Sequence, residues 1–169
     1  GMDDGDIITQ RSVEIKDTDN VGIIHDELSV MGRDLLLETL PNIFSGNITR
    51  TKQNDDEVTF AYNITREQER IDFNKTAREV FNQIRGMYPF PVAYTTLNDE
   101  VIKICESKIG NDETGKIGEI IKTDKEGIHV KCKDKSIIIT RLKPSGKKEM
   151  SSKDYLNGKN KSLVGEILC

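Results

Sequence analysis

The feature that most constrains the fold is a change in the spacing of apolar residues at Pro91. Upstream, apolar side chains recur at helical spacing, whereas downstream they occupy alternate positions for most of the remaining chain. Alternation of this kind is typical of half-buried strands, and turn signals such as Asn98-Asp99 separate the runs. The pattern predicts five strands and a short helix, at residues 93–97, 101–108, 118–123, 128–133, 136–142 and 151–157. Short strands at this spacing indicate a small barrel or sandwich.

Upstream of Pro91 the spacing predicts two amphipathic helices. The first follows helix-capping side chains at residues 17–20 and places four apolar residues on one face, which we expect to be packed: Ile24, Leu28, Met31 and Leu35. Pro41 should bend or end this helix, because proline cannot donate a backbone hydrogen bond. The second helix is expected to run from near Lys75 to Tyr88, and Phe90 is expected to be a core anchor just beyond it.

The segments around the first helix read as a strand and a linker. Residues 6–16 begin with an apolar pair and then alternate, which predicts a strand. Residues 45–56 are polar and have no period, which indicates a linker or surface loop, and a short extended piece follows at residues 58–62. The residues alone therefore suggest a small α/β piece, a linker and a β-rich domain.

Charge is distributed unevenly along the chain. Residues 1–100 hold 10 Lys and Arg against 19 Asp and Glu, a formal charge of −9, whereas residues 101–169 hold 15 against 10, a charge of +5. A basic segment on an acidic chain is the electrostatic pattern of a polyanion-binding domain. Lysines on solvated strand faces would produce the same balance, so the charge alone leaves both interpretations open.

Cysteine content and apolar run length bear on location and metal binding. Three widely spaced cysteines and the absence of a signal-peptide pattern favour a reducing, cytoplasmic setting. No apolar run approaches the roughly 20 residues of a membrane span, so no membrane association is expected. His129 and Cys132 lie three residues apart on a predicted strand and would point to opposite faces, so no metal site is predicted.

A series of sequence blocks carries a family resemblance. Residues 1–8, GMDDGDII, are similar to the G-L-D-T-G-D-I-L stretch that ends the catalytic core of folate-dependent formyltransferases. Further blocks follow at the right distances, at residues 25–28, 35–40, 70–73, 83–85, 88–94, 144–151 and 154–158. In that order and across essentially the whole chain, they resemble the C-terminal half of the methionyl-tRNA formyltransferase family.

The resemblance implies an α+β chain of three parts. In the family, a Rossmann-like N-terminal domain binds 10-formyltetrahydrofolate and transfers its formyl group to methionyl initiator tRNA, and an OB-like C-terminal domain helps to hold the tRNA. Residues 1–45 would then be the last strand and helix of the catalytic domain, residues 46–64 the linker, and residues 65–169 an OB-like β-barrel domain. The family's folate pocket lies upstream of these residues, so the chain alone is expected to be inactive and to need the missing catalytic half as a partner.

The family's catalytic set is an Asn, a His and an Asp, and only the Asp has a counterpart here, at Asp3. A carboxylate there can orient an imidazole and stabilise charge during attack of the amine on the formyl carbon. The alternative is a solvated acid near a chain terminus. His25, in the first helix, and His129, expected on a strand at the surface, do not match the family's histidine. Gly1 either matches the family's glycine or is what a cleaved tag leaves before Met2.

The resemblance also implies a tRNA-binding surface on the basic segment. The candidate residues are Lys131, Lys133, Arg141, Lys143, Lys147 and Lys148. Alternation would place Lys131, Lys133 and Lys135 on one strand face, and Lys147 and Lys148, in the Gly-Lys-Lys turn, are the first choices. Two alternatives remain: a stand-alone OB-like binding module or degenerate paralogue, and a sugar-nucleotide formyltransferase. The blocks at residues 144–151 and 154–158 argue against the latter.

Overall fold

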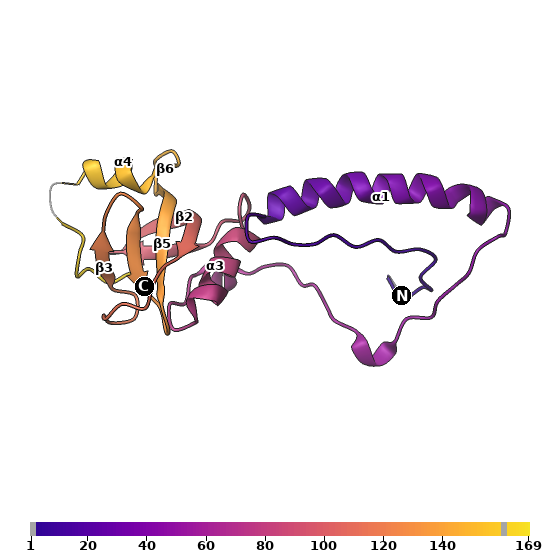
Figure 1. Ribbon diagram of the computed structural model, residues 1–169, viewed down its shortest axis with the longest axis horizontal. Coiled ribbons are helices and arrows are strands. Elements are labelled where there is room, and N and C mark those ends of the chain that lie inside the picture. The colour runs from indigo at the N-terminus through magenta and orange to yellow at the C-terminus, as the bar shows by residue number, and fades with distance from the viewer. Residues whose placement is uncertain (1–2, 160–161) are drawn as a thin grey trace. The chain divides into compact units, whose positions relative to one another are not determined.

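The computed structural model describes residues 3–159 and 162–169, and Gly1 and Met2, matched above to the family's Gly-Leu, lie outside the described residues. The described chain forms two compact units. Unit 1 comprises the described residues up to Asp19 together with Ile23–Asn63, and unit 2 comprises Asn20–Gly22 and the described residues from Ile64 onward. Each unit is built around different elements, labelled in Figure 1.

Unit 1 consists of one long helix and extended chain. The helix α1 spans Val21–Phe44. Residues 8–16 form no strand, and within the described part of unit 1 the only pairing of the predicted strand is an isolated bridge between Ile7 and Thr51. The prediction of a strand at residues 6–16 is therefore wrong, because the alternating segment finds no neighbouring strand beyond this one bridge.

Helix α1 differs from its prediction in two ways. It does not end at Pro41 but continues to Phe44, three residues further on, and a bond from the Ser45 N–H to the Pro41 carbonyl closes its last turn. The expected packed face is not buried: no α1 residue is buried, and Leu28 is 47% exposed. Extended chain alone is too thin a layer to cover this face. No described helix, α1 included, combines the length and apolarity needed to cross a membrane.

Unit 2 begins with two capped helices. Helix α2, Arg66–Glu69, and helix α3, Ala77–Gly86, each start with a capping box in which a threonine and a Gln or Glu three residues later satisfy each other's backbone N–H groups. Helix α3 buries Ala77, Val80 and Ile84, which share one face at spacings of three and four. That face packs on the sheet at β2 and β5.

The sheet is antiparallel and curled, as Figure 1 shows. Its strands run in the order β1-β2-β5-β4-β3, and β6 pairs with β5. The bounds are β1 Tyr94–Leu97, β2 Glu100–Ile109, β3 Ile120–Thr123, β4 Ile128–Lys131, β5 Ser136–Pro144 and β6 Met150–Ser151. All five predicted strands are present, and α4, Ser152–Asn157, is the predicted terminal helix, with Ser151 as its N-cap. A mixed α/β chain with a curled antiparallel sheet is thus confirmed.

The C-terminal segment, residues 165–169, bonds to both outer strands of the sheet. On the β3 side, Gly165 donates its N–H to the Ile120 carbonyl, and Leu168 donates to the Gly118 carbonyl at 2.8 Å. On the β1 side, Cys169 exchanges backbone bonds with Thr96. Gly118 has φ of +79°, and a Cβ there would lie 2.5 Å from the Leu168 oxygen, so glycine is required at this approach.

One hydrophobic core lies inside the sheet and under α3 and α4. Its largest fully buried side chains include Ile84, Ile104, Ile120, Ile137, Ile139 and Leu142. Tyr155 of α4 and Leu168 of the C-terminal segment complete it. Phe90 is 82% exposed, so its prediction as a core anchor is wrong; Met87, at the end of the helix, packs against the core instead.

Candidate nucleic-acid interface

Three exposed lysines lie at the hairpin between β5 and β6: Lys143 near the end of β5, and Lys147 and Lys148 in the turn itself, which we call the basic turn. Strand β5 ends at Pro144, whose carbonyl accepts a bond from the Lys147 N–H at 3.1 Å, and Gly146 turns the chain with φ of +69°. Lys143, Lys147 and Lys148 are exposed. Among the described residues no carboxylate forms an ion pair with them. The turn therefore offers positive charge that the described protein does not neutralise.

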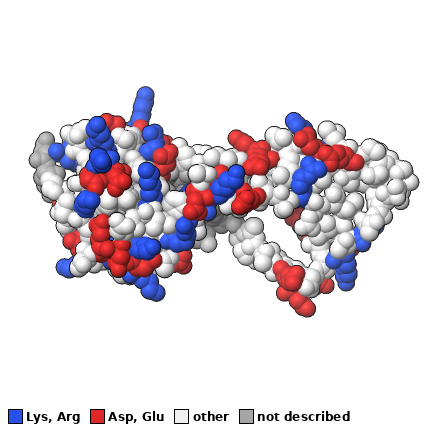
Figure 2. Space-filling model, viewed as in Figure 1, with Lys and Arg blue, Asp and Glu red and all other residues white. Residues whose placement is uncertain are grey.

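Acidic neighbours pair with some of the remaining basic residues and leave others available to bind phosphate. On the face of unit 2 drawn in Figure 2, basic side chains project between acidic ones. Lys131 Nζ lies 2.9 Å from Asp112 Oδ1 and also donates to the Asp134 carbonyl, and only 12% of its side chain is exposed. Its charge is already paired within the protein, unlike the charges of Lys143, Lys147 and Lys148.

The expected stripe of Lys131, Lys133 and Lys135 on one strand face does not form. Strand β4 ends at Lys131, and the chain then turns, with the Cys132 N–H bonded to the Lys135 carbonyl at 2.8 Å. Alternation of faces applies only within a strand, so this part of the prediction is wrong. Lys133 is exposed on the bend and stays a candidate by itself.

Arg141 takes part in an internal network. Its Nε donates to Glu149 Oε1 at 2.8 Å, and the bond to Glu149 raises the pKa of the guanidinium. The Tyr88 hydroxyl donates to the other Glu149 oxygen at 3.3 Å, and burial followed by the Glu149 charge raises the pKa of that phenol. Glu106 lies 3.7 Å from Arg141 on the other side. Arg141 therefore ties β5 to the strand after the basic turn.

Asp3 lies in unit 1 with its main chain held by the linker. It adopts φ of 61°, and the Gln53 side-chain amide donates to the carbonyls of Asp3 at 2.9 Å and Gly5 at 2.7 Å. The Asp3 side chain is exposed. The role of Gln53 had no signal in the sequence, because it depends on a contact 50 residues away within a polar, aperiodic stretch.

The two histidines differ in their exposure to solvent. His25 is exposed on α1, as predicted, with Nδ1 3.1 Å from Asp26. His129 was expected at a surface but is buried, with 4% of its side chain exposed, and its Nε2 lies 3.1 Å from Asp124. Cys132 belongs to the hydrophobic core, so His129 and Cys132 do not form a metal pair.

Unit 2 thus combines a capped helix packed on a curled antiparallel sheet with a basic turn at one hairpin. The family model for the C-terminal domain of formyl transferases matches residues 63–160, more than half of the chain. The chain therefore belongs to the formyl transferase C-terminal domain family.

Within that family, the chain is similar to the C-terminal half of methionyl-tRNA formyltransferases. It is 48% identical to the Bacillus velezensis enzyme over 161 residues, which cover 94% of this chain and 51% of that protein. It is 47% identical to the enzyme of Staphylococcus aureus MW2 over 171 residues, covering 99% and 54%. The chain thus spans about half the length of the curated relatives it matches.

Solved structures show the same fold at low identity. HypX from Aquifex aeolicus has a TM-score of 0.68 at 19% identity, covering 92% of this chain and 29% of that one. An N-formyltransferase from Helicobacter canadensis, solved with folinic acid and dTDP-3-aminofucose, has a TM-score of 0.61 at 23% identity, covering 82% and 51%. At these identities the likeness is one of fold.

Proposed function

We propose that this chain is the tRNA-holding part of a methionyl-tRNA formyltransferase, which transfers a formyl group from 10-formyltetrahydrofolate to methionyl initiator tRNA. The observation that carries the proposal is identity of 44–48% over 161–171 residues with enzymes of that name, matching about half of their length. Residues 1–45 are then the end of a Rossmann-like catalytic domain, 46–64 the linker and 65–169 an OB-like barrel. The hydrogen bonds of the C-terminal segment to both outer strands support the barrel.

Unit 2 holds the tRNA mainly through its phosphates. Lys143, Lys147 and Lys148 are exposed, and no described carboxylate pairs with them, so each can approach a phosphate and release condensed counterions. Lys133 adds a further exposed charge. Contacts of this type fix the position of a nucleic acid without reading its bases. Discrimination of initiator tRNA then depends on the catalytic half as well.

Unit 1 completes the catalytic half of the enzyme. Helix α1 buries none of its 24 residues, and Ile23, Leu28 and Leu37 are each about half exposed or more. Full burial of such a side chain contributes roughly 1.5–3 kcal/mol, so covering the exposed half contributes roughly half as much. The catalytic half supplies that cover, together with the folate pocket and the family's Asn and His.

Asp3 has a role only within that assembly. When the methionine amine attacks the formyl carbon, the amine loses a proton and the carbonyl oxygen gains charge; the bond from that carbon to N10 of the folate then breaks, and N10 takes up a proton. The Asp3 carboxylate would orient the histidine that takes up the proton and stabilise its positive charge. Alone, the chain offers Asp3 no described imidazole partner, so it should not turn over.

A titration with fluorescent initiator tRNA tests the proposal. Binding should weaken at least tenfold between about 50 and about 200 mM salt, because several phosphate contacts are lost together. Elongator methionine tRNA should bind comparably, since the chain reads phosphates, and a short duplex DNA more weakly. Failure to bind initiator tRNA at low salt would leave the alternative, an OB-like module or degenerate paralogue with another partner or none.

A further inference from the structure

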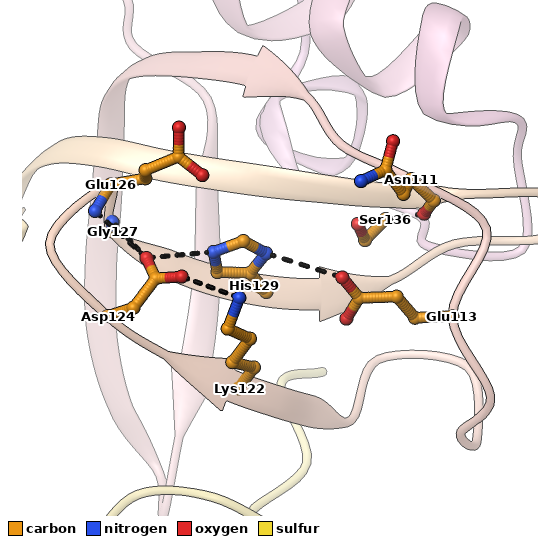
Figure 3. Close-up of polar contacts among 8 residues, drawn as sticks. All are labelled: Asn111, Glu113, Lys122, Asp124, Glu126, Gly127, His129 and Ser136. Atoms are coloured by element: carbon orange, nitrogen blue, oxygen red, sulfur yellow. Dashed lines mark hydrogen bonds and ion pairs between the residues drawn. The ribbon is translucent and has the colours of Figure 1, made fainter.

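The β3–β4 hairpin holds a buried histidine between carboxylates, drawn in Figure 3. His129 comes from β4, and its Nε2 lies 3.1 Å from Asp124 Oδ1 in the turn. On the other side of the ring, Nδ1 points toward Glu113 Oε1 at 3.9 Å. That nitrogen is buried and has no hydrogen-bond partner in the described protein. A ring nitrogen in this position is costly unless a nearby group comes to satisfy it.

Asp124 is held in a fixed orientation by the turn itself. Its Oδ1 accepts the Glu126 N–H at 2.9 Å, and its Oδ2 lies 2.7 Å from Lys122 Nζ. The bond to Lys122 and then the Glu126 N–H hold the pKa of this carboxyl well below its usual range. Asp124 is therefore an anion facing the His129 ring at neutral pH.

Glu126 brings a third donor to the same point. One carboxylate oxygen each from Asp124 and Glu126 and one ring nitrogen of His129 all lie within 4.8 Å of one another. Donors around a tetrahedral zinc ion, at bonds of about 2.0–2.2 Å, stand roughly 3.3–3.6 Å apart. The donors here are therefore somewhat further apart than zinc requires. Glu126 is exposed, so its side chain can rotate to bring its oxygen closer to the other two donors.

We propose that Asp124, Glu126 and His129 form a binding site for a divalent first-row transition metal ion of the zinc class, with water as the fourth ligand. His129 binds through Nε2, and a proton on Nε2 passes to solvent when the metal binds. The remaining proton sits on Nδ1 and is donated to Glu113. A ligating histidine that gives its other N–H to a carboxylate is the usual arrangement at metal sites, and it accounts for the unpartnered Nδ1 aimed at Glu113.

The ligand types select among metals. An imidazole nitrogen with two carboxylates suits zinc, cobalt or nickel, whereas magnesium and calcium prefer oxygen donors throughout. Lys122 stays on the outer oxygen of Asp124, and its single positive charge together with the two charges of the metal ion balances the carboxylates of Asp124, Glu126 and Glu113. The bound ion would link the turn to β4 and stabilise the hairpin that carries the C-terminal segment.

The test is a calorimetric titration of the full chain with zinc at neutral pH, in a Cys169→Ser background. The substitution is needed because Cys169 is exposed and its thiol is itself a zinc ligand. Cys105 and Cys132 are buried, and burial raises the pKa of each to about 12, so they stay protonated. We expect saturable one-to-one binding and a rise in Tm with zinc concentration.

Variants of residues outside the buried core, the exposed Glu126 and the partly exposed Glu113, keep the test independent of folding. Glu126→Gln should weaken zinc binding at least about tenfold and abolish the rise in Tm, and Glu113→Gln should weaken it about tenfold through the histidine. Glu100→Gln, an exposed acid at the start of β2, should bind zinc as the parent does. Calcium should not compete. Absence of one-to-one binding, or equal binding by parent and Glu126→Gln, would overturn the proposal.

Discussion

The backbones of Thr96 and Cys169 exchange two hydrogen bonds across 73 residues of sequence. The Thr96 N–H donates to the Cys169 oxygen at 2.8 Å, and the Cys169 N–H donates back at 3.1 Å. The hydroxyls of Thr95 and Thr96 donate to the same Cys169 oxygen at 3.0 Å each. Such multiple bonding to one atom fixes the position of the C-terminal segment at the edge of β1, and Leu168 anchors it in the core.

Leu168→Ala should lower the free energy of unfolding by about 2–4 kcal/mol, because it removes a buried leucine and leaves a cavity. Leu168 is 5% exposed, whereas Val164, the residue just before the segment, is 49% exposed. Val164→Ala should therefore cost less than about 1 kcal/mol. Urea denaturation followed by circular dichroism measures both, and equal losses would show that the segment is not anchored through Leu168.

The double variant Lys147→Ala, Lys148→Ala should weaken initiator tRNA binding about tenfold and reduce the slope of affinity against salt by roughly 1–2. The double variant Lys116→Ala, Lys125→Ala removes two exposed lysines outside the basic turn and serves as the matched control. Fluorescence titration over a series of salt concentrations gives both quantities. If the control lowers the slope as much, binding depends on total charge and not on the basic turn.

Arg141→Ala should affect stability more than tRNA binding. Its guanidinium bonds to Glu149 at 2.8 Å, so the substitution leaves Glu149 without its cation, while the backbone pairing of β5 and β6 remains. A partly exposed ion pair of this kind contributes on the order of 0.5–1 kcal/mol. Urea denaturation should detect the change, while the salt slope of tRNA binding should remain that of the parent. A reduced slope would place Arg141 among the phosphate contacts.

Asp134 should make the stability of unit 2 depend on acid pH. Its carboxylate accepts the N–H of Ala77 at the start of α3, and that bond holds its pKa below the usual value of 3.8. A lowered folded-state pKa adds stability above pH 3.8 that is lost as pH falls through the folded value. Asp134→Asn keeps an acceptor, so the variant should lose part of the pH dependence but little stability at neutral pH. Thermal melts across the acid range provide the comparison.

Thiol reactivity should separate the three cysteines. Burial raises the pKa of Cys105 and Cys132 to about 12, so their thiolate fractions are small and their sulfur atoms inaccessible. Cys169 is exposed. In the native protein a thiol reagent should modify Cys169 rapidly and the other two only after addition of urea. Rapid modification of more than one thiol before unfolding would contradict the burial of the core cysteines.

Much of unit 2 was predictable because apolar residues recur at alternate positions in the sequence, as the alternating burial along β1 reflects, although β4 and the first half of β5 are buried on both faces. The alternation of apolar residues located all five main strands, and the capping serine at Ser151 marked the start of the terminal helix. The end of β4 was missed by two residues because the turn at Lys135 is set by a backbone bond and not by side-chain polarity. The strand predicted at residues 6–16 is absent for a different reason. Its apolar residues do alternate, but a strand also needs a neighbouring strand, and this segment has only one isolated bridge in the described chain.

The candidate sites were less predictable. The sequence blocks identified the family, and Lys147 and Lys148 were recognisable from the Gly-Lys-Lys turn. The pairing of Lys131 with Asp112 was not, because it joins side chains 19 residues apart. His129 looked like a surface residue because alternation assigns faces but does not show that Asp124 and Glu113 fold over one of them.

The bonding of the C-terminal segment to both β1 and β3 also protects the protein from self-association. The outer strands of an open sheet present unpaired N–H and C=O groups that recruit strands from other molecules. Here residues 165–169 bond to the backbone groups of Thr96 in β1 and Ile120 in β3. Before the segment docks, during synthesis or refolding, the two outer strands are bare, and molecules in that state can pair with one another. Late docking would make aggregation during refolding depend on protein concentration, even though the finished domain has little tendency to associate through its sheet.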